Sequence, residues 1–380
     1  MKRINYIDAS RGLAVILAMM AHSMIHYVTG IQVMIDAQVW IQIVTRTATP
    51  TFMVLFGIMI ELVYLRRLRE GAPADRTVTR LLERMITCYV LFFLVMMAGA
   101  VTGKFSFTKA FLAIAYFETG NYGVILQIYA VLFAIIAATL GLARRWGSLV
   151  YAGIAGLGWA LKFTLEATHA PAIYPLQYLI GYGFGFGPAI LPGMTLVAFG
   201  ALVGEMLTGR RARFWAPAIG AGAMAVVLWN IATSGLHEYA RLVTDVFRWN
   251  NDVFYYTFGI AVSSLSLIFF AGIDRARKGA APGKFSLAAL GRDTLYIYGG
   301  GNIFLNLLPG YTGQSHLAFL AVAAFLCALM LSSIYKPQVS QVANRLSAGW
   351  ISRIYRGYKA VCSRIILGLR GNRPLTPPAT

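Results

Sequence analysis

Long apolar runs separated by short arginine-rich segments recur along the whole chain. Each run is roughly 20 residues long, which is the length that an α-helix needs to cross a hydrocarbon core of about 30 Å. The pattern therefore predicts an all-α integral membrane protein with about ten transmembrane helices. The predicted spans are residues 12–29, 48–65, 85–102, 122–142, 148–167, 188–208, 214–233, 252–273, 285–308 and 316–335.

The basic residues between these runs predict an orientation in the membrane. With the N-terminus on the cytoplasmic side, 25 of the 33 lysines and arginines fall in inside segments and only five fall in outside segments. The outside five are Arg46, Lys104, Lys109, Arg241 and Arg248. Cytoplasmic segments of membrane proteins carry such an excess of lysine and arginine. We therefore predict that both termini are cytoplasmic.

Composition agrees with this class and excludes others. Of the 380 residues, 58% are hydrophobic and 12% are charged, which is typical of a polytopic membrane protein. The net charge of +19 does not indicate nucleic-acid binding, because the arginines lie in short clusters between apolar runs instead of forming one basic face. The three cysteines have neither a disulfide framework nor the spacing of a metal site. We expect no nucleic acid and no metal among the ligands.

The chain reads as one membrane domain followed by a tail. Residues 1–336 hold all the predicted spans, and the first ten residues are too short for a separate leader peptide. Residues 337–371 mix aromatic and aliphatic side chains with arginines, as does a basic amphipathic helix that lies on anionic membrane lipids. Residues 372–380 are proline-rich, and we predict that they are disordered.

Two ionisable residues mark the first predicted span. Arg11 and His22 are eleven residues apart, which is close to three helical turns, so they share one helix face about 16 Å apart along its axis. This spacing puts an arginine at the cytoplasmic edge and an imidazole deep in the membrane, where ionisable groups are costly and generally functional. In the alternative reading, Arg11 only anchors the helix at the lipid headgroups and His22 bonds a neighbouring helix.

Five stretches of the chain, in order, resemble the acyltransferase-3 family of integral membrane acyltransferases. In the first, IDASRGLAVILAMMAH at 7–22, an Asp is followed three residues later by Arg-Gly and after ten more by a His. The other four are RTATPTFMVLFGIMI at 46–60, RLLERMITCYVLFF at 80–93, GNYGVILQIYAVLFAII at 120–136 and ALGRDTLYIYGGGNIF at 289–304. The wider superfamily includes the glucan succinyltransferases and the heparan-glucosaminide acetyltransferases.

Two features depart from the pattern of that family. The family often has Arg-x-x-Arg before or within the third span. Here Arg66 and Arg69 have that spacing one loop earlier, whereas Arg80 and Arg84 are four apart, so either pair is a candidate. Gly301 stands where the late helix commonly has a His, so a proton relay through a second histidine is not expected.

The resemblance implies transfer of an acyl group, most simply acetyl, from cytoplasmic acyl-coenzyme A to a hydroxyl of an extracytoplasmic or cell-envelope glycan. The membrane would be the bacterial cytoplasmic (inner) membrane. His22 is then the candidate general base or acyl carrier. Arg11 is a candidate phosphate or network residue, and Asp8, three residues earlier, orients it or caps the helix. Phosphates favour forked arginine contacts, and the candidates for coenzyme binding are Arg66, Arg69, Arg80 and Arg84.

Further polar residues inside the predicted spans are candidates for lining the substrate site. They are His26, Glu61, Gln127, Tyr129 and Tyr298. A carboxylate as deep as Glu61 needs a partner, and we expect an arginine near the coenzyme. Gln127 and Tyr129 equally fit interhelical hydrogen bonds.

Two ion pairs are expected away from the site. Lys162 and Glu166 are four residues apart near the outer end of their span and should pair along the helix. Arg292 and Asp293 lie at the inner end of the ninth span, where they are either site residues or a pair that reaches to the interface, and we favour the pair.

Other functions fit parts of the same pattern. A transporter or flippase also has about ten spans and buried charge, but the chain shows no inverted repeat and no paired broken helices. A scaffold that binds lipid through its basic tail leaves His22 unexplained. Within the enzyme class, N-transfer in place of O-transfer and succinyl in place of acetyl stay open, as does the oligomeric state.

Overall fold

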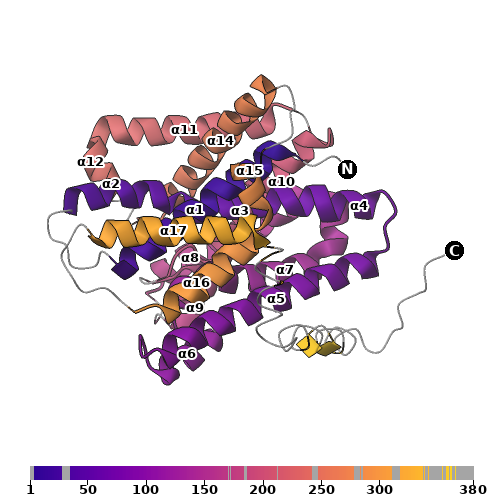
Figure 1. The fold of residues 1–380 in the computed structure, drawn as a ribbon. Coiled ribbons are helices and arrows are strands. Elements are labelled where there is room, and N and C mark those ends of the chain that lie inside the picture. The colour runs from indigo at the N-terminus through magenta and orange to yellow at the C-terminus, as the bar shows by residue number, and fades with distance from the viewer. Residues whose placement is uncertain are drawn as a thin grey trace.

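The computed structural model consists of helices joined by short links, with no strand in the part of the chain that it describes (Figure 1). That part comprises residues 4–27, 35–169, 171, 173–183, 186–211, 213–241, 247–277, 283, 286–309 and 317–336, with isolated positions in the tail. The basic tail and the proline-rich end predicted from the sequence therefore lie largely outside the described residues.

The helices follow one another closely along the chain. Up to the seventh predicted span they are α1 (Asn5–Tyr27), α2 (Ile35–Arg46), α3 (Ala48–Met59), η2 (Ile60–Leu65), α4 (Arg66–Arg69), α5 (Ala74–Val101), α6 (Phe107–Ile114), η3 (Asn121–Gly123), α7 (Val124–Trp146), α8 (Ser148–Ala167), α9 (Tyr174–Ile180), α10 (Ile190–Leu207) and α11 (Trp215–Ser234). The remainder are α12 (Leu236–Arg241), α13 (Phe247–Trp249), α14 (Val253–Ala276), α15 (Leu287–Arg292), η5 (Tyr296–Gly300), α16 (Gly301–Leu307) and α17 (Leu317–Ile334).

Seven helices of the described chain are long and apolar enough to cross a membrane. They are Trp40–Arg69, Ala74–Val101, Val124–Trp146, Ser148–Ala167, Ile190–Leu207, Trp215–Ser234 and Val253–Ala276. These coincide with the second to eighth predicted spans, so the prediction of an all-α, multi-pass membrane protein is confirmed. The total of ten spans and the cytoplasmic placement of both termini stay predictions.

The remaining three predicted spans are helical without meeting the same criterion. Helix α1 covers the first, and Leu320–Ile334 in α17 is a shorter apolar helix. The ninth predicted span, 285–308, is not one regular helix, because it is divided into α15, the π-helical turns of η5 and α16. Three consecutive glycines, 299–301, lie where η5 passes into α16, and glycine has a low helix propensity.

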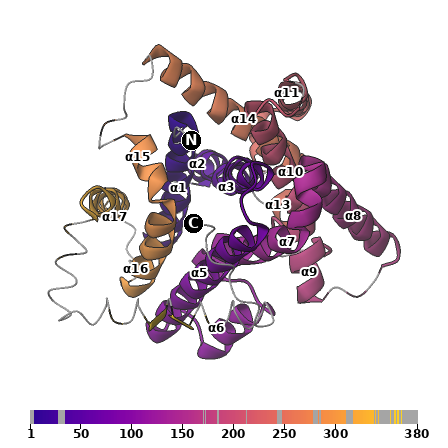
Figure 2. The same ribbon diagram turned by 90° about the vertical axis from the view of Figure 1, so that its right-hand side faces the viewer.

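The central helices of the bundle are α3 and α10. In the apolar windows of the spans that contain them, 78% and 72% of the residues are buried, against 28% for α8 and 22% for α11. Figure 2, viewed along the bundle, accordingly shows α8 and α11 at the rim. A helix with so little burial within the protein has most of its apolar surface left for lipid.

Helix α15 lies against the start of α1 because two glycines permit it. A Cβ atom on Gly12 would stand 2.0 Å from the carbonyl oxygen of Leu287, and one on Gly291 would stand 1.7 Å from that of Asp8. Both distances are impossible for a real side chain, so only glycine fits. The close approach brings Arg292, at the end of α15, beside the helix that carries Arg11.

Arginines gather at one end of the bundle, which we call the arginine-rich end. It comprises the start of α1, the α4–α5 link, the end of α7 and the residues after α10, and it lies on the right of Figure 1 where α4 is labelled. The sequence predicts that this end is cytoplasmic. The other end, with α2, α6 and α12, is called the opposite end.

Candidate functional site

A cavity of about 340 Å³ extends into the bundle from the arginine-rich end, and we call it the arginine cavity. Its polar lining includes Arg11, Tyr64, Arg84, Tyr129, Arg292, Thr294 and Tyr298. The rest is mainly apolar, from α3, α5 and α7. Three guanidinium groups around a long apolar cavity are a suitable chemistry for a molecule with phosphates at one end and a thin apolar arm at the other.

A second cavity of about 260 Å³ lies toward the opposite end, and we call it the histidine cavity. Its polar lining includes His22, Thr45, Arg46, Thr49, Thr119, Tyr122, Arg248 and Tyr298. None of the described residues that line it is acidic. The cavity therefore combines one imidazole with two guanidinium groups and several hydroxyls.

The two cavities abut. Phe52, Ile125 and Tyr298 line both of them, so a single layer of side chains, the septum, separates the two spaces. The rings of Phe52 and Tyr298 meet edge to face at 6.2 Å. Both ends of the septum are held by hydrogen bonds, since Tyr298 Oη donates to the carbonyl of Tyr122 over 3.0 Å and Tyr129 Oη donates to that of Phe52 over 2.7 Å.

The geometry of His22 fits a proton acceptor. Its Nδ1 lies 2.7 Å from Oδ1 of Asn302 on α16. An amide oxygen only accepts, so Nδ1 carries the proton and Nε2 keeps its lone pair. The imidazole stacks on Tyr122, with ring centroids 5.1 Å apart, and meets Tyr298 edge-on at 5.6 Å. Ring contacts and the amide bond together fix both the tautomer and the plane of the imidazole.

Arg248 is held rigidly at the rim of the histidine cavity. Its Nε donates to the carbonyl of Gly187 over 3.2 Å, and its guanidinium lies 4.9 Å from the ring centroid of Trp249. Burial lowers the pKa of Arg248 from the ordinary arginine value of 12.5. An arginine side chain is a cation at neutral pH. Together with Arg46, Arg248 makes this cavity attractive to an anionic group.

At the arginine cavity, Arg11 and Asp8 lie together as the sequence predicts. Their closest atoms, Nη1 and Oδ1, are 3.9 Å apart, and the arginine side chain is 29% exposed, so it can still turn toward a ligand. The predicted pairing of Arg292 with Asp293 is wrong. Arg292 lines the cavity, whereas Asp293 accepts a bond from Lys336. The sequence signal for Arg292 was its position next to Gly291, where α15 packs against α1.

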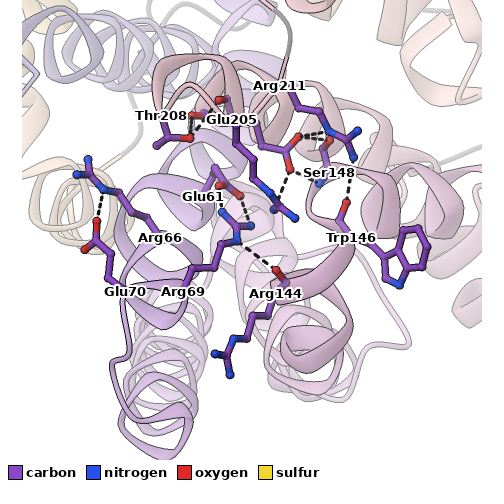
Figure 3. A network of polar contacts seen from close by, with 12 residues as sticks. Glu61, Arg66, Arg69, Glu70, Arg144, Trp146, Ser148, Glu205, Thr208 and Arg211 are labelled. Carbon is purple, nitrogen blue, oxygen red and sulfur yellow. Dashed lines mark hydrogen bonds and ion pairs between the residues drawn. The ribbon is translucent and has the colours of Figure 1, made fainter.

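Of the four arginines predicted to bind coenzyme, only Arg84 lines the arginine cavity. Arg80 is exposed on α5, and Arg66 pairs with Glu70 over 2.7 Å at the surface. Arg69 bonds both carboxylate oxygens of Glu61, and its Nε donates to the carbonyl of Arg144 over 3.1 Å (Figure 3). Glu61 thus has the arginine partner that the sequence predicts, but neither member of this pair lines either cavity.

A second buried carboxylate completes this network, which we call the carboxylate clamp. Glu205, fully buried on α10, accepts from Ser148 Oγ over 2.7 Å and from Arg210 and Arg211 over 3.3 Å each (Figure 3). These two arginines also bond the carbonyls of residues 145 and 146, directly after the one that Arg69 bonds. These bonds satisfy the backbone carbonyl groups at the end of α7 and link that end to α4 and α10.

The other predicted lining residues divide into two groups. Tyr129 and Tyr298 line the cavities. Gln127 is buried and donates to the carbonyl of Ala113, which is an interhelical structural bond. His26 lies one turn beyond His22 but lines neither cavity, because its Nε2 bonds the carbonyl of Pro309 over 3.2 Å and its Nδ1 faces Lys104 Nζ at 3.4 Å.

Sequence reasoning missed Asn302, Arg46 and Arg248. Asn302 lies 280 residues from His22 along the chain, and only packing of α16 against α1 joins them. The signal that was available for the two arginines is their rarity, since they are two of the five basic residues predicted on the outside.

Comparison with known protein families gives a match. The family model described as heparan-alpha-glucosaminide N-acetyltransferase, catalytic, matches residues 3–240, which is more than half of the chain. A search of curated proteins finds no match. The matched stretch includes Arg11, His22, Arg46 and Arg84, whereas Arg248, Arg292 and Asn302 lie beyond it.

Proposed function

Because the chain belongs to the family of heparan-alpha-glucosaminide N-acetyltransferase catalytic domains, we propose that it is a membrane acetyltransferase that moves acetyl from acetyl-coenzyme A to a sugar. The observation that carries the proposal is the pair of abutting cavities, one with three arginines and the other with His22. The name of this family favours an amine as acceptor over the hydroxyl expected from the motifs. The closer assignment to the acyltransferase-3 family rests on those motifs alone.

The donor belongs in the arginine cavity. Guanidinium groups of Arg11, Arg84 and Arg292 suit the phosphates of coenzyme A, and the apolar lining suits its pantetheine arm. The arm would bring the thioester to the septum, one side-chain layer from His22. The proposal requires the arginine-rich end on the cytoplasmic side, where acetyl-coenzyme A is made, with the acceptor glycan on the other side and membrane lipids around the bundle.

The reaction needs a base on the acceptor side. His22 Nε2 accepts a proton from the acceptor amine or hydroxyl, and the nitrogen or oxygen attacks the thioester carbonyl carbon. The new C–N or C–O bond forms as the C–S bond breaks, and the departing coenzyme A thiolate takes the proton back from His22. Arg46 and Arg248 attract an anionic group of the acceptor, such as those of heparan-type glycans.

Acetyl-coenzyme A binding tests the donor site. We expect Arg84→Gln to raise the Kd of acetyl-coenzyme A about tenfold or more, because a charge-assisted phosphate contact is lost. The measurement is isothermal titration on protein in lipid nanodiscs. The matched control is Arg76→Gln, an exposed arginine two turns earlier on the same helix. An equal Kd for the Arg84 variant and the wild type would place the coenzyme elsewhere, and no binding by folded wild type would favour a transporter.

Asn302 is proposed as the positioning residue of His22. Asn302→Leu removes the acceptor for Nδ1–H, and we expect kcat to fall roughly 10- to 100-fold with an unchanged KM for acetyl-coenzyme A. Asn302→Asp keeps an oxygen acceptor and should retain most of the rate. A purely structural role would instead lower the melting temperature of both variants, so the pair is compared by both kinetics and thermal unfolding. Equal rates for the two variants would contradict the positioning role.

A further inference from the structure

A third cavity, of about 500 Å³, lies at the opposite end beside the last turns of α8, and we call it the α8 cavity. Its lining combines three aromatic residues with several polar ones. The aromatic residues are Trp159, Phe163 and Tyr182. The polar ones include Lys162, Glu166 and Asn250. No step of the proposed acetyl transfer uses any of them.

Lys162 is an unusual residue in the lining of this cavity. It is only 5% exposed, although it lies in a helix that is long and apolar enough to span the membrane. Its Nζ donates to Glu166 Oε1 over 2.5 Å, as the sequence predicts, and lies 5.4 Å from the ring centroid of Phe163. A buried cation in such a helix is costly, and in membrane proteins ionisable pairs of this kind mark binding sites.

Neighbouring residues of two links, which we call the wall, line the α8 cavity and the histidine cavity. Residues 186–187 and 248–249 line the histidine cavity, whereas 182–183 and 250–253 of the same two links line the α8 cavity. The two cavities have no lining residue in common, but residues 249 and 250 are consecutive, so the two spaces are neighbours along this link. A ligand of several units that occupied both spaces would lie across the wall.

Asn251 holds the wall in place. Its side chain is fully buried, and its Nδ2 donates to the carbonyl of Phe186 over 2.5 Å. Its Oδ1 accepts from the backbone N–H of Ala189 over 2.7 Å and from Tyr256 Oη over 2.8 Å. These bonds join the two links to each other and to α10 and α14. The spacing of the two cavities is thereby fixed.

We propose that the α8 cavity binds a second sugar of the acceptor glycan while the sugar to be acetylated lies in the histidine cavity. The proposal rests on the proposed function and extends it from a single sugar to an oligosaccharide. Phe163 is 50% exposed and its ring stacks on that of Trp159 with centroids 5.6 Å apart, so the pair offers an aromatic surface for the C–H face of a pyranose ring. Lys162, Glu166 and Asn250 offer donors and acceptors for hydroxyl and anionic substituents.

Saccharides of two lengths test the proposal. The probes are glucosamine and a heparan-type tetrasaccharide with a terminal glucosamine, each titrated without donor onto wild type, Lys162→Met and Phe163→Ala in nanodiscs. We expect the Kd of the tetrasaccharide to rise about tenfold in both variants, while that of glucosamine stays constant. The matched control is Phe111→Ala on α6, whose side chain is 56% exposed against 50% for Phe163.

The two Kd values in the two variants decide for or against the second subsite. An unchanged Kd of the tetrasaccharide in both variants, or an equal rise for both saccharides, would overturn the second subsite. Acetyl-coenzyme A binding by the same variants serves as a check on folding. One substitution removes a charge and the other removes an aromatic ring, so if one variant fails to fold, the other still tests the subsite. Because no donor is present, failure of the wild type to transfer acetyl would count against the proposed function and not against the subsite.

Discussion

Replacement of His22 by alanine should abolish acetyl transfer and leave acetyl-coenzyme A bound. We expect His22→Ala to lower kcat by roughly 10²- to 10⁴-fold, because the acceptor loses the base that takes its proton. The Kd of acetyl-coenzyme A should stay within about twofold, since the arginine cavity lies across the septum. The measurements are transfer of radiolabelled acetyl to glucosamine and titration of the donor, both on protein in nanodiscs.

His26→Gln is the matched comparison for this loss. His26 is on the same helix, one turn further, and lines neither cavity in the structure. Glutamine keeps a donor for the carbonyl of Pro309, so transfer should stay within a few-fold of wild type. Comparable losses in both variants would show that the effect comes from disturbance of α1. Normal turnover of His22→Ala would remove His22 from the chemistry altogether.

Loss of Arg69 should produce the largest change in stability. Glu61 is fully buried, and Arg69→Leu leaves its carboxylate without the guanidinium that bonds both oxygens. We expect the free energy of unfolding to fall by about 3–5 kcal/mol, because an uncompensated buried charge is expensive. Reversible unfolding in mixed detergent micelles measures this value. The Kd of acetyl-coenzyme A should not change in the fraction that stays folded.

A double substitution distinguishes the cost of the unpaired charge from the cost of lost packing. Glu61→Leu combined with Arg69→Leu removes both charges, and most of the lost stability should return, since apolar replacement of a whole buried pair is often neutral. Arg66→Gln is the surface control, because its pair with Glu70 is exposed and should contribute less than about 1 kcal/mol. A double variant as unstable as the single one would mean that packing, and not charge, sets the cost.

Much of the fold could be predicted because its signals are local. Apolar length and arginine position alone predicted seven helices that the structure describes as long enough to span a membrane. Helical spacing also predicted the pairs Lys162–Glu166 and Asp8–Arg11, since residues three or four apart meet on one helix face. The interruption of the ninth span was not predicted. A hydropathy pattern does not distinguish a regular helix from one with π-helical turns.

In the candidate site too, positions set by a single helix were predictable and positions set by packing between helices were not. Arg11 and His22 share α1, so their separation by three turns was available from the sequence, and the structure places them at two cavities on either side of the septum. Asn302 was not available, because its place follows from the packing of α16 against α1.

Local spacing also failed to distinguish between the arginine pairs. Arg69 and Arg84 each lie near the arginine-rich end, and the sequence gives them equal standing. Whether a guanidinium meets a carboxylate or a cavity depends on which helix lies opposite. Arg69 meets Glu61 beside α10, whereas Arg84 faces the cavity between α3, α5 and α7.

In the proposed reaction, the acyl end of the donor reaches the septum from the arginine cavity. The most direct test is photolabelling with an acyl-coenzyme A whose short acyl group carries a diazirine, followed by mass-spectrometric mapping of the label. We expect label on Phe52, Ile125 or Tyr298, reduced by excess acetyl-coenzyme A and by Arg84→Gln. Label confined to other surfaces, or label that acetyl-coenzyme A does not displace, would contradict it.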